Sequence, residues 1–274
     1  MMESIGRRMT AAPELTDLIG HYYEIQTPSG FDPQVYHLSP SLEMMLAFNF
    51  GPPIRFSFGN QLDRSIQKIF ILGPLRHMLT YELRANADLL IINFTHNGFY
   101  RLLAQSMQNL NLEEWSESKL LAQTQQLEEL WQTLASFPDT HQRLEYLNSY
   151  LVSRLAPDEA EAVPLLTHAA AFHSPVVSPV KIIAAETNRT ERTVQLRFKK
   201  YVGYSPKELL RFLRFKEVLH TLTNRSEASV NWFELIEQYG YHDQSHLIKD
   251  FQYYTGVSPR QFLKLSDAFC SSRD

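Results

Sequence analysis

The phrase that decides the fold occurs twice in this chain, as FKKYVGYSPKE at residues 198–208 and as FQYYTGVSPRQ at residues 251–261. In both copies a glycine stands five residues after the phenylalanine, and Ser-Pro and then Glu or Gln follow. Glycine readily adopts the left-handed backbone that ends a helix. Serine is a good N-cap, proline suits the first helical position, and Glu or Gln at the third position completes a capping box. Each copy therefore predicts the end of one helix and the immediate start of the next.

The residues ahead of each copy predict two short helices joined by a tight turn. Thr190 and Asp243 are N-cap types, and each lies eight residues before the phenylalanine of its copy. Four residues after each cap comes an apolar side chain, Val194 or Leu247, on the helix face that the phenylalanine shares. A further helical segment, VKIIAAE or NWFELIEQYG, precedes each cap. This is the spacing of a helix-turn-helix unit, present twice, and the second helix of such a unit lies in the major groove of DNA.

The outward faces of the two second helices carry the side chains that we expect to contact DNA, because Arg, Lys and Gln suit base edges and Ser and Thr suit phosphates. In the first helix the candidates are Arg192, Thr193, Gln195, Arg197, Lys199 and Lys200. In the second helix they are Gln244, Ser245, His246, Ile248 and Lys249. Two alternatives stay open: Lys199 and Lys200 also suit the dipole at a helix C-terminus, and His246 also suits a local cap.

Residues 180–265 resemble the AraC/XylS family of bacterial transcription regulators, on IAAETNRTERTVQLRFKKYVGYSPKELLRFLRFKEVLHTL and YGYHDQSHLIKDFQYYTGVSPRQFLK. The resemblance implies two helix-turn-helix units joined by a linker helix from Ser205 to about Leu222. It implies that they enter successive major-groove segments on one face of the duplex. The base-facing positions carried over from the family are Arg192, Gln195, Leu196, Gln244, Ser245, His246 and Lys249.

Three positions depart from the family pattern. Leu196 stands where arginine is frequent, and it has no group that donates a hydrogen bond, so Arg197 is an alternative phosphate contact. Val218 and Ile236 stand where alanine is usual, and each adds bulk between helices that we expect to pack together. These departures leave the expected fold in place and leave the fine docking geometry open.

Charge is unevenly distributed along the chain. The formal net charge is −4, yet residues 180–216 hold 10 Lys and Arg against 3 Asp and Glu, whereas residues 1–164 hold 11 against 19. A basic block on an acidic chain indicates a polyanionic partner, and the alternative is a solvated, salt-bridged helical face. Residues 226–264 hold 3 Lys and Arg against 5 Asp and Glu. We therefore expect the first unit to dominate affinity for double-stranded DNA.

The preceding residues divide into three further segments, and together they predict an α+β protein. Residues 1–110 are a predicted β-rich domain, in which residues from about 20 to 96 read as short strands separated by turn residues, typical of a barrel or sandwich. IFILGPLRHMLTYELRANADLLIINFTHNGFYRLL resembles a cupin-like N-terminal domain of unknown function. Residues 111–157 are a predicted helical connection, residues 158–179 a linker zone, and residues 180–266 the all-α DNA-binding domain. Leucine stripes in 111–157 fit packing on the chain's own sheet or, equally, a homodimer.

Neither an enzyme nor a metal site is indicated. His21, His37, His77 and His96 are scattered without a His-x-His pair, and no G-x-S-x-G elbow, P-loop or HExxH motif occurs. The single cysteine, Cys270, excludes a disulfide framework, and we expect no cofactor. Aromatic side chains either fill the N-terminal core or line a ligand pocket, and the ligand-binding residues stay unknown. These aromatic residues are Tyr22, Tyr23, Phe48, Phe50, Phe56, Phe58, Tyr81 and Phe94.

The sequence therefore predicts a sequence-specific DNA-binding transcription regulator of the bacterial cytoplasm that responds to a small-molecule effector through its N-terminal domain. One alternative is an N-terminal domain that binds a protein partner and no small molecule. A more remote alternative is a cupin-type enzyme with a DNA-binding appendage. RNA polymerase is a further expected partner if the protein is an activator, and the absence of a long apolar run indicates no membrane contact.

Overall fold

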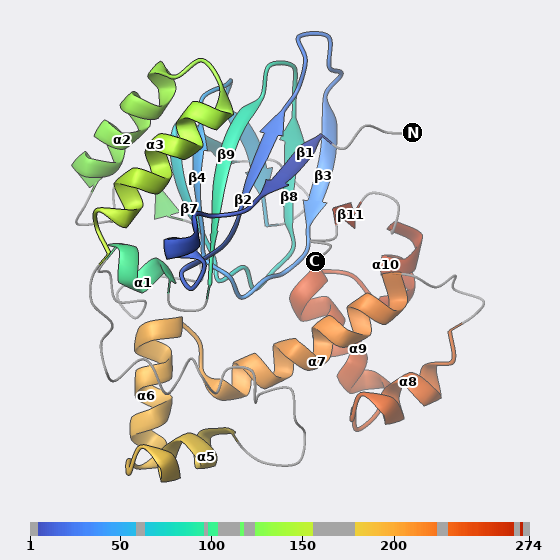
Figure 1. Ribbon diagram of the computed structural model, residues 1–274. Helices are drawn as coiled ribbons and strands as arrows, with labels where there is room; N and C mark the ends of the chain where they lie inside the picture. Colours follow the sequence, from blue (N-terminus) through green and yellow to red (C-terminus); the bar gives the residue numbers. More distant parts are fainter. Residues whose placement is uncertain are drawn as a thin grey trace.

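The computed structural model describes residues 5–58, 64–95, 98–103, 116–117, 124–155, 179–223, 230–265 and 269–270. Within them the chain forms a β-rich N-terminal part with helices packed beside it and an all-helical C-terminal part (Figure 1). This confirms the α+β class. The expected linker zone lies outside the described residues except for Pro179, where a helix begins, and His96 and Leu120 also lie outside them.

The described strands form two sheets. The six-stranded sheet has the order β1-β2-β9-β4-β7-β10, with the bounds β1 Gly6–Met9, β2 Ile19–Gln26, β9 Asp88–Phe94, β4 Met45–Asn49, β7 Ile69–Leu72 and β10 Ser116–Glu117. The five-stranded sheet has the order β11-β3-β8-β5-β6, with the bounds β11 Phe269–Cys270, β3 Gln34–Leu38, β8 Leu79–Leu83, β5 Ile54–Ser57 and β6 Arg64–Ile66. Neighbours run antiparallel, except that β11 is parallel to β3. Neither sheet closes into a barrel within the described residues.

The two sheets share an apolar core. Ile25 and Phe70 contribute to it from the six-stranded sheet, and Phe56 and Leu83 contribute from the five-stranded sheet. Successive side chains of a strand point to opposite faces, yet all five residues of β4 are buried. The six-stranded sheet must therefore be covered on its other face as well. Of the barrel and sandwich alternatives, the structure shows two open sheets packed on a common core.

Helices α2 (Thr124–Ser136) and α3 (Thr140–Val152) cover that other face (Figure 1). Tyr22 and Phe48 of the sheet share a second core with the buried leucines of the two helices, which are Leu127, Leu130, Leu134, Leu147 and Leu151. The short 3-10 helix η1 (Pro13–Leu15) and helix α1 (Gly98–Leu103) join the same core. Among the described leucines of 111–157, these five pack on the chain's own sheet.

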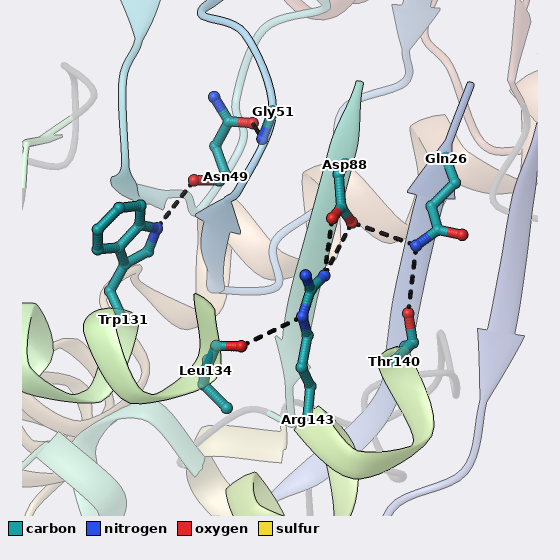
Figure 2. A network of polar contacts seen from close by, with 8 residues as sticks. All are labelled: Gln26, Asn49, Gly51, Asp88, Trp131, Leu134, Thr140 and Arg143. Atoms are coloured by element: carbon teal, nitrogen blue, oxygen red, sulfur yellow. Dashed lines mark hydrogen bonds and ion pairs between the residues drawn. The ribbon is translucent and has the colours of Figure 1, made fainter. Parts of the chain in front are cut away.

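A polar network fastens α2 and α3 to the sheet at one edge of this core (Figure 2). Arg143 of α3 donates to both carboxylate oxygens of Asp88 at 3.0 and 2.8 Å and to the Leu134 carbonyl at 3.2 Å. Its guanidinium lies 4.0 Å from the centre of the Phe50 ring. Trp131 of α2 donates to the backbone carbonyl at the end of β4 at 2.8 Å. Arg143 is 7% exposed, and these partners offset the free-energy cost of burying its charge.

Residues 179–265, as far as the structure describes them, contain helices and no strand. The helices are α5 (Pro179–Glu186), α6 (Glu191–Val202), α7 (Pro206–Thr223), α8 (Trp232–Gln238), α9 (Gln244–Thr255) and α10 (Pro259–Leu265). Val194 and Phe198 of α6 and Leu247 and Phe251 of α9 are buried in one core, as the repeated stripe predicted. No helix in the described segments is both long and apolar enough to cross a bilayer.

The predicted helix boundaries are confirmed at both copies of the phrase. Gly203 and Gly256 have positive φ values of 89° and 75° and end α6 and α9. Ser205 begins α7 in a complete capping box, in which its backbone N–H donates to Glu208 at 2.6 Å and its hydroxyl accepts from the Glu208 N–H at 3.2 Å. Ser258 makes the same two bonds with Gln261, at 2.9 and 3.3 Å.

Replacing Arg143 by alanine is expected to lower the free energy of unfolding by about 3 kcal/mol, because it leaves Asp88, at the start of the inner strand β9, without its cation. Urea unfolding followed by far-ultraviolet circular dichroism measures this. The matched control is Glu128→Ala, which removes an exposed ion pair between α2 and Lys68 beside β7 and is expected to cost less than about 1 kcal/mol. Equal losses in the two variants would contradict the importance of the buried network.

Candidate nucleic-acid interface

Helix α7 connects the two repeated units and packs directly against α9. The Phe215 ring of α7 stacks on Tyr254 with 4.5 Å between ring centres and meets Phe251 edge-on at 5.0 Å. At its other end α7 continues from α6 through the turn that contains Tyr204, whose side chain is fully buried against Phe198. Helices α6 and α9 are therefore both positioned by α7, with α6 at its N-terminal end (Figure 1).

A buried carboxylate adds a polar constraint to this packing. Asp250 of α9 is fully buried and lies 2.8 Å from Arg211 Nε and 3.4 Å from an Arg214 terminal nitrogen, both on α7. Arg211 and Arg214 stand one helical turn apart, so their two side chains reach the same acidic group. Without the Asp250 carboxylate, the half-buried guanidinium groups of Arg211 and Arg214 would lose their shared partner. The two ion pairs therefore fix α9 on α7.

Helix α6 presents most of its predicted DNA-contacting residues on one open face. Arg192, Gln195 and Lys199 are exposed, and Leu196 is 55% exposed. The other predicted DNA-contacting residues of α6 are half-buried: Thr193, Arg197 and Lys200. The Thr193 hydroxyl lies 2.9 Å from that of the N-cap Thr190, whose Oγ1 also accepts from the Thr193 N–H at 3.2 Å.

Helix α9 presents a smaller polar face. Gln244, Ser245 and Lys249 are exposed, and Ile248 is half-buried. The His246 side chain is half-buried: its Nε2 lies 3.2 Å from Arg214, and its ring meets Tyr241 edge-on at 5.1 Å. The His246 backbone N–H donates to the N-cap Asp243 at 2.7 Å.

The N-terminal domain contacts the C-terminal ends of both helices. The loop between β7 and β8, residues 73–78, supplies two donors to the last turn of α9: His77 Nδ1 lies 2.5 Å from the Tyr253 carbonyl, and the Met78 N–H donates to the Tyr254 carbonyl at 2.8 Å. The last carbonyls of a helix have no partner within the helix, so these contacts complete its hydrogen bonding. We call residues 73–78 the β7–β8 loop.

The end of α6 meets the N-terminal domain at helix α1 (Figure 1). The Tyr100 ring of α1 lies edge-on to Tyr201 with 4.9 Å between ring centres. Lys200 lies over the Tyr100 ring at 5.7 Å and over the Tyr201 ring at 4.6 Å, and it donates to the Tyr201 hydroxyl at 3.2 Å. Lys200 thus lies at the domain junction in this structure, whereas Arg192, Gln195 and Lys199 remain exposed.

An ion pair also connects the N-terminal domain to the start of α7. Arg76 of the β7–β8 loop lies 2.8 Å from Glu208. Burial raises the pKa of the Glu208 carboxyl, but the bonds from Ser205 and the Arg76 guanidinium outweigh it and hold that pKa below its usual value. Burial raises the pKa of the adjacent Tyr204 hydroxyl, and the Glu43 carboxylate adds to this rise. The junction therefore contains an ionised carboxylate beside a neutral phenol.

Sequence reasoning did not predict the contacts that Arg76, His77 and Asp250 make with other elements. Arg76 and His77 lie in a loop between strands, where periodicity carries no signal. Asp250 had one available signal: it is an acidic residue three positions after the core residue Leu247, on the helix face that periodicity assigns to the interior. A buried carboxylate requires a cation, and that requirement leads to the arginines of α7.

The histidines that the structure describes are not gathered into a metal site. Within the described part of the chain, no three His, Cys, Asp or Glu side chains lie where they could hold a metal ion together. His37 Nδ1 lies 3.0 Å from the Thr80 hydroxyl, and His77 contacts α9. Burial, with a smaller effect of Arg8, lowers the pKa of His21 to about 4, so this imidazole is neutral near pH 7.

Comparisons with known proteins agree with the two-part organisation. A family profile described as a helix-turn-helix domain matches residues 183–265, and one described as a domain of unknown function, DUF6597, matches residues 7–115. Among solved structures, ToxT from Vibrio cholerae is similar with a TM-score of 0.39 and 12% identity, over 89% of this chain and 97% of that chain. The AraC-like transcriptional activator CuxR is similar with a TM-score of 0.29 and 12% identity, over 74% and 78%. A search of curated proteins gave no match.

Replacing Asp250 by alanine is expected to lower the free energy of unfolding by about 3 kcal/mol, because Arg211 and Arg214 lose their shared partner. The matched control is Asp243→Ala, which removes an exposed N-cap of the same helix and is expected to cost clearly less than the loss of the buried carboxylate. Chemical denaturation of the full chain measures both. A loss in Asp250→Ala no larger than in the control would show that the buried carboxylate does not hold α9 in place.

Proposed function

We propose that this chain, whose C-terminal domain is an AraC-type helix-turn-helix domain, regulates transcription by binding specific double-stranded DNA sites through α6 and α9. The observation that carries the proposal is the pairing of the two helices on α7, each with polar or basic side chains exposed on the face away from its core. In this reading α7 connects the two helices, which enter neighbouring major-groove segments of one duplex.

The exposed side chains divide into two roles. Arg192, Lys199 and Lys249 neutralise phosphates and release counterions, which supplies affinity that falls with rising salt. Gln195 and Gln244 are placed to read base edges, because a side-chain amide pairs with two groups of adenine in the major groove. Ser245, Thr193 and Arg197 serve backbone contacts, and His246 serves mainly to support α9 through Arg214.

The N-terminal domain acts by holding the two helices at a set spacing, without covering their DNA-reading faces. It contacts the last turn of α9 through His77 and Met78 and the end of α6 through Tyr100. Most of the residues proposed to contact DNA lie before these last turns, and Lys199, in the last turn of α6, remains exposed. A signal that moves the β7–β8 loop relative to α1 would change the distance between the helices. In this proposal the signal passes to α6 and α9 through these direct contacts between the domains.

The signal proposed for the N-terminal domain is a small-molecule effector, with a protein partner as the second candidate. The second candidate is favoured by one observation: Tyr22, Phe48, Phe56 and Phe94 are at most 1% exposed and so fill the cores. The proposal places the regulator in the bacterial cytoplasm, with RNA polymerase as a partner if it activates. A homodimer is also part of the proposal.

Arg192→Ala is expected to weaken binding to a selected DNA site about tenfold, and Lys249→Ala about threefold, because α6 belongs to the more basic unit. Gel-shift titration at fixed salt measures both, with the exposed Arg7→Ala in β1 as the control that should bind like the unchanged protein. An equal or larger loss in Lys249→Ala would overturn the dominance of the first unit.

The double variant Arg76→Ala/His77→Ala is expected to tolerate altered half-site spacing, because it frees the start of α7 and the end of α9 from the β7–β8 loop. Binding is measured on duplexes that carry one or two base pairs inserted between the half-sites. The unchanged protein should lose affinity steeply with each insertion and the variant much less. Arg55→Ala, which breaks an ion pair with Glu82 inside the five-stranded sheet, is the control. Identical spacing profiles would refute the proposed role of the N-terminal domain.

A further inference from the structure

The DNA-facing surface of α6 contains one large apolar side chain. Leu196 is 55% exposed, although the other described apolar residues of α6 before its last turn, Val194 and Phe198, are at most 2% exposed. A single exposed leucine is common on protein surfaces and by itself indicates nothing. Its position on the helix is what distinguishes Leu196.

Leu196 lies near the centre of the outward face of α6. A helix turns by about 100° per residue, which places Arg192 about 40° and Lys199 about 60° from Leu196, both on the same side of it around the axis. The same geometry places Val194 and Phe198 about 160° away, on the side that the core covers. Arg192 and Lys199 are exposed, so cations that attract phosphate stand beside an apolar side chain that cannot contact phosphate. When Arg192 and Lys199 meet the backbone of one DNA strand, Leu196 lies about 40–60° further around the helix, opposite the core, and faces the floor of the groove.

The chemistry of the major groove leaves one favourable partner for that side chain. Guanine, adenine and cytosine present hydrogen-bonding groups there, and thymine alone adds an apolar group, its C5-methyl. A leucine placed over the polar edge of another base would remove water from that edge and return no hydrogen bond. We infer that Leu196 reads the C5-methyl group of a thymine, an assignment that rests on the proposed function of α6 as a DNA-reading helix.

The inference gives α6 a mixed recognition code. Gln195 reads a base by hydrogen bonds, and Leu196 selects thymine at an adjacent position by apolar contact. The contribution of one methyl group to binding is small, so Leu196 refines specificity and leaves most of the affinity to the cations. Loss of the methyl is expected to weaken binding about fourfold, the effect of exposing one buried methyl-sized group.

The test removes the methyl from the DNA and the leucine from the protein. Sites are first selected from a random pool of double-stranded oligonucleotides with the full-length protein. Each thymine of the selected site is then replaced singly by deoxyuridine, which lacks only the C5-methyl. Affinity is measured for the unchanged protein and for Leu196→Ala, Leu196→Met and Leu210→Ala. Leu210 is a partly exposed leucine of α7 and serves as the matched control.

One thymine is expected at which deoxyuridine weakens the unchanged protein and Leu210→Ala about fourfold while Leu196→Ala binds both duplexes equally. Leu196→Met keeps an apolar side chain and is expected to retain most of the penalty. If a site is selected but no thymine distinguishes the unchanged protein from Leu196→Ala, the inference is wrong and the proposed function stands. If the protein selects no sequence from the pool, the proposed function itself is contradicted, and the inference with it.

Discussion

The buried Asp250 carboxylate, held between Arg211 and Arg214, is the contact on which the geometry of the helical part depends. Apolar packing between Phe215 and Phe251 gives α7 and α9 affinity for each other, but apolar contacts are not directional. The ion pairs add direction, because a carboxylate inside a protein must meet its cations at defined distances. The ion pairs fix α9 on α7, and α6 continues into α7 through the turn and the capping box at Ser205.

The second constraint comes from the six-stranded sheet. Its faces are buried against the five-stranded sheet on one side and against α2 and α3 on the other, so its strands have little freedom to shift. Two of the segments that contact the helical part start from this sheet: the β7–β8 loop follows β7, and α1 lies just after β9. A rigid base thereby holds the ends of two helices that belong to different repeats. This arrangement explains why the contacts lie at the C-terminal ends and leave Arg192 and Lys249 exposed.

Much of the helical part could be predicted from the sequence because its signals are local. Gly203, Ser205 and Glu208 determine a helix end and a helix start through backbone conformation and hydrogen bonds within six residues, and the structure confirms them. Open sheets could not be distinguished from a barrel, because closure depends on pairing between distant strands. Periodicity gave the leucine stripes of α2 and α3 but not the surface that they cover.

The predicted DNA-contacting residues show the same limit. Periodicity correctly separates the exposed Gln195 from the buried Val194, since both follow from the turn of one helix. It places Lys200 outward as well, but Tyr100 comes from a segment 100 residues earlier and covers it. His246 likewise meets Arg214, a residue of another helix. When a side chain is covered by a residue from a distant part of the chain, the pattern within its own helix cannot predict that contact.

The central claim is that α6 and α9 read one DNA duplex together from the same side. Hydroxyl-radical footprinting of the full-length protein on a selected site measures this most directly. Two protected segments are expected on one face of the duplex, centred about one helical turn, roughly 10 base pairs, apart. A single protected segment that persists when Lys249 is replaced, or two segments on opposite faces, would contradict it.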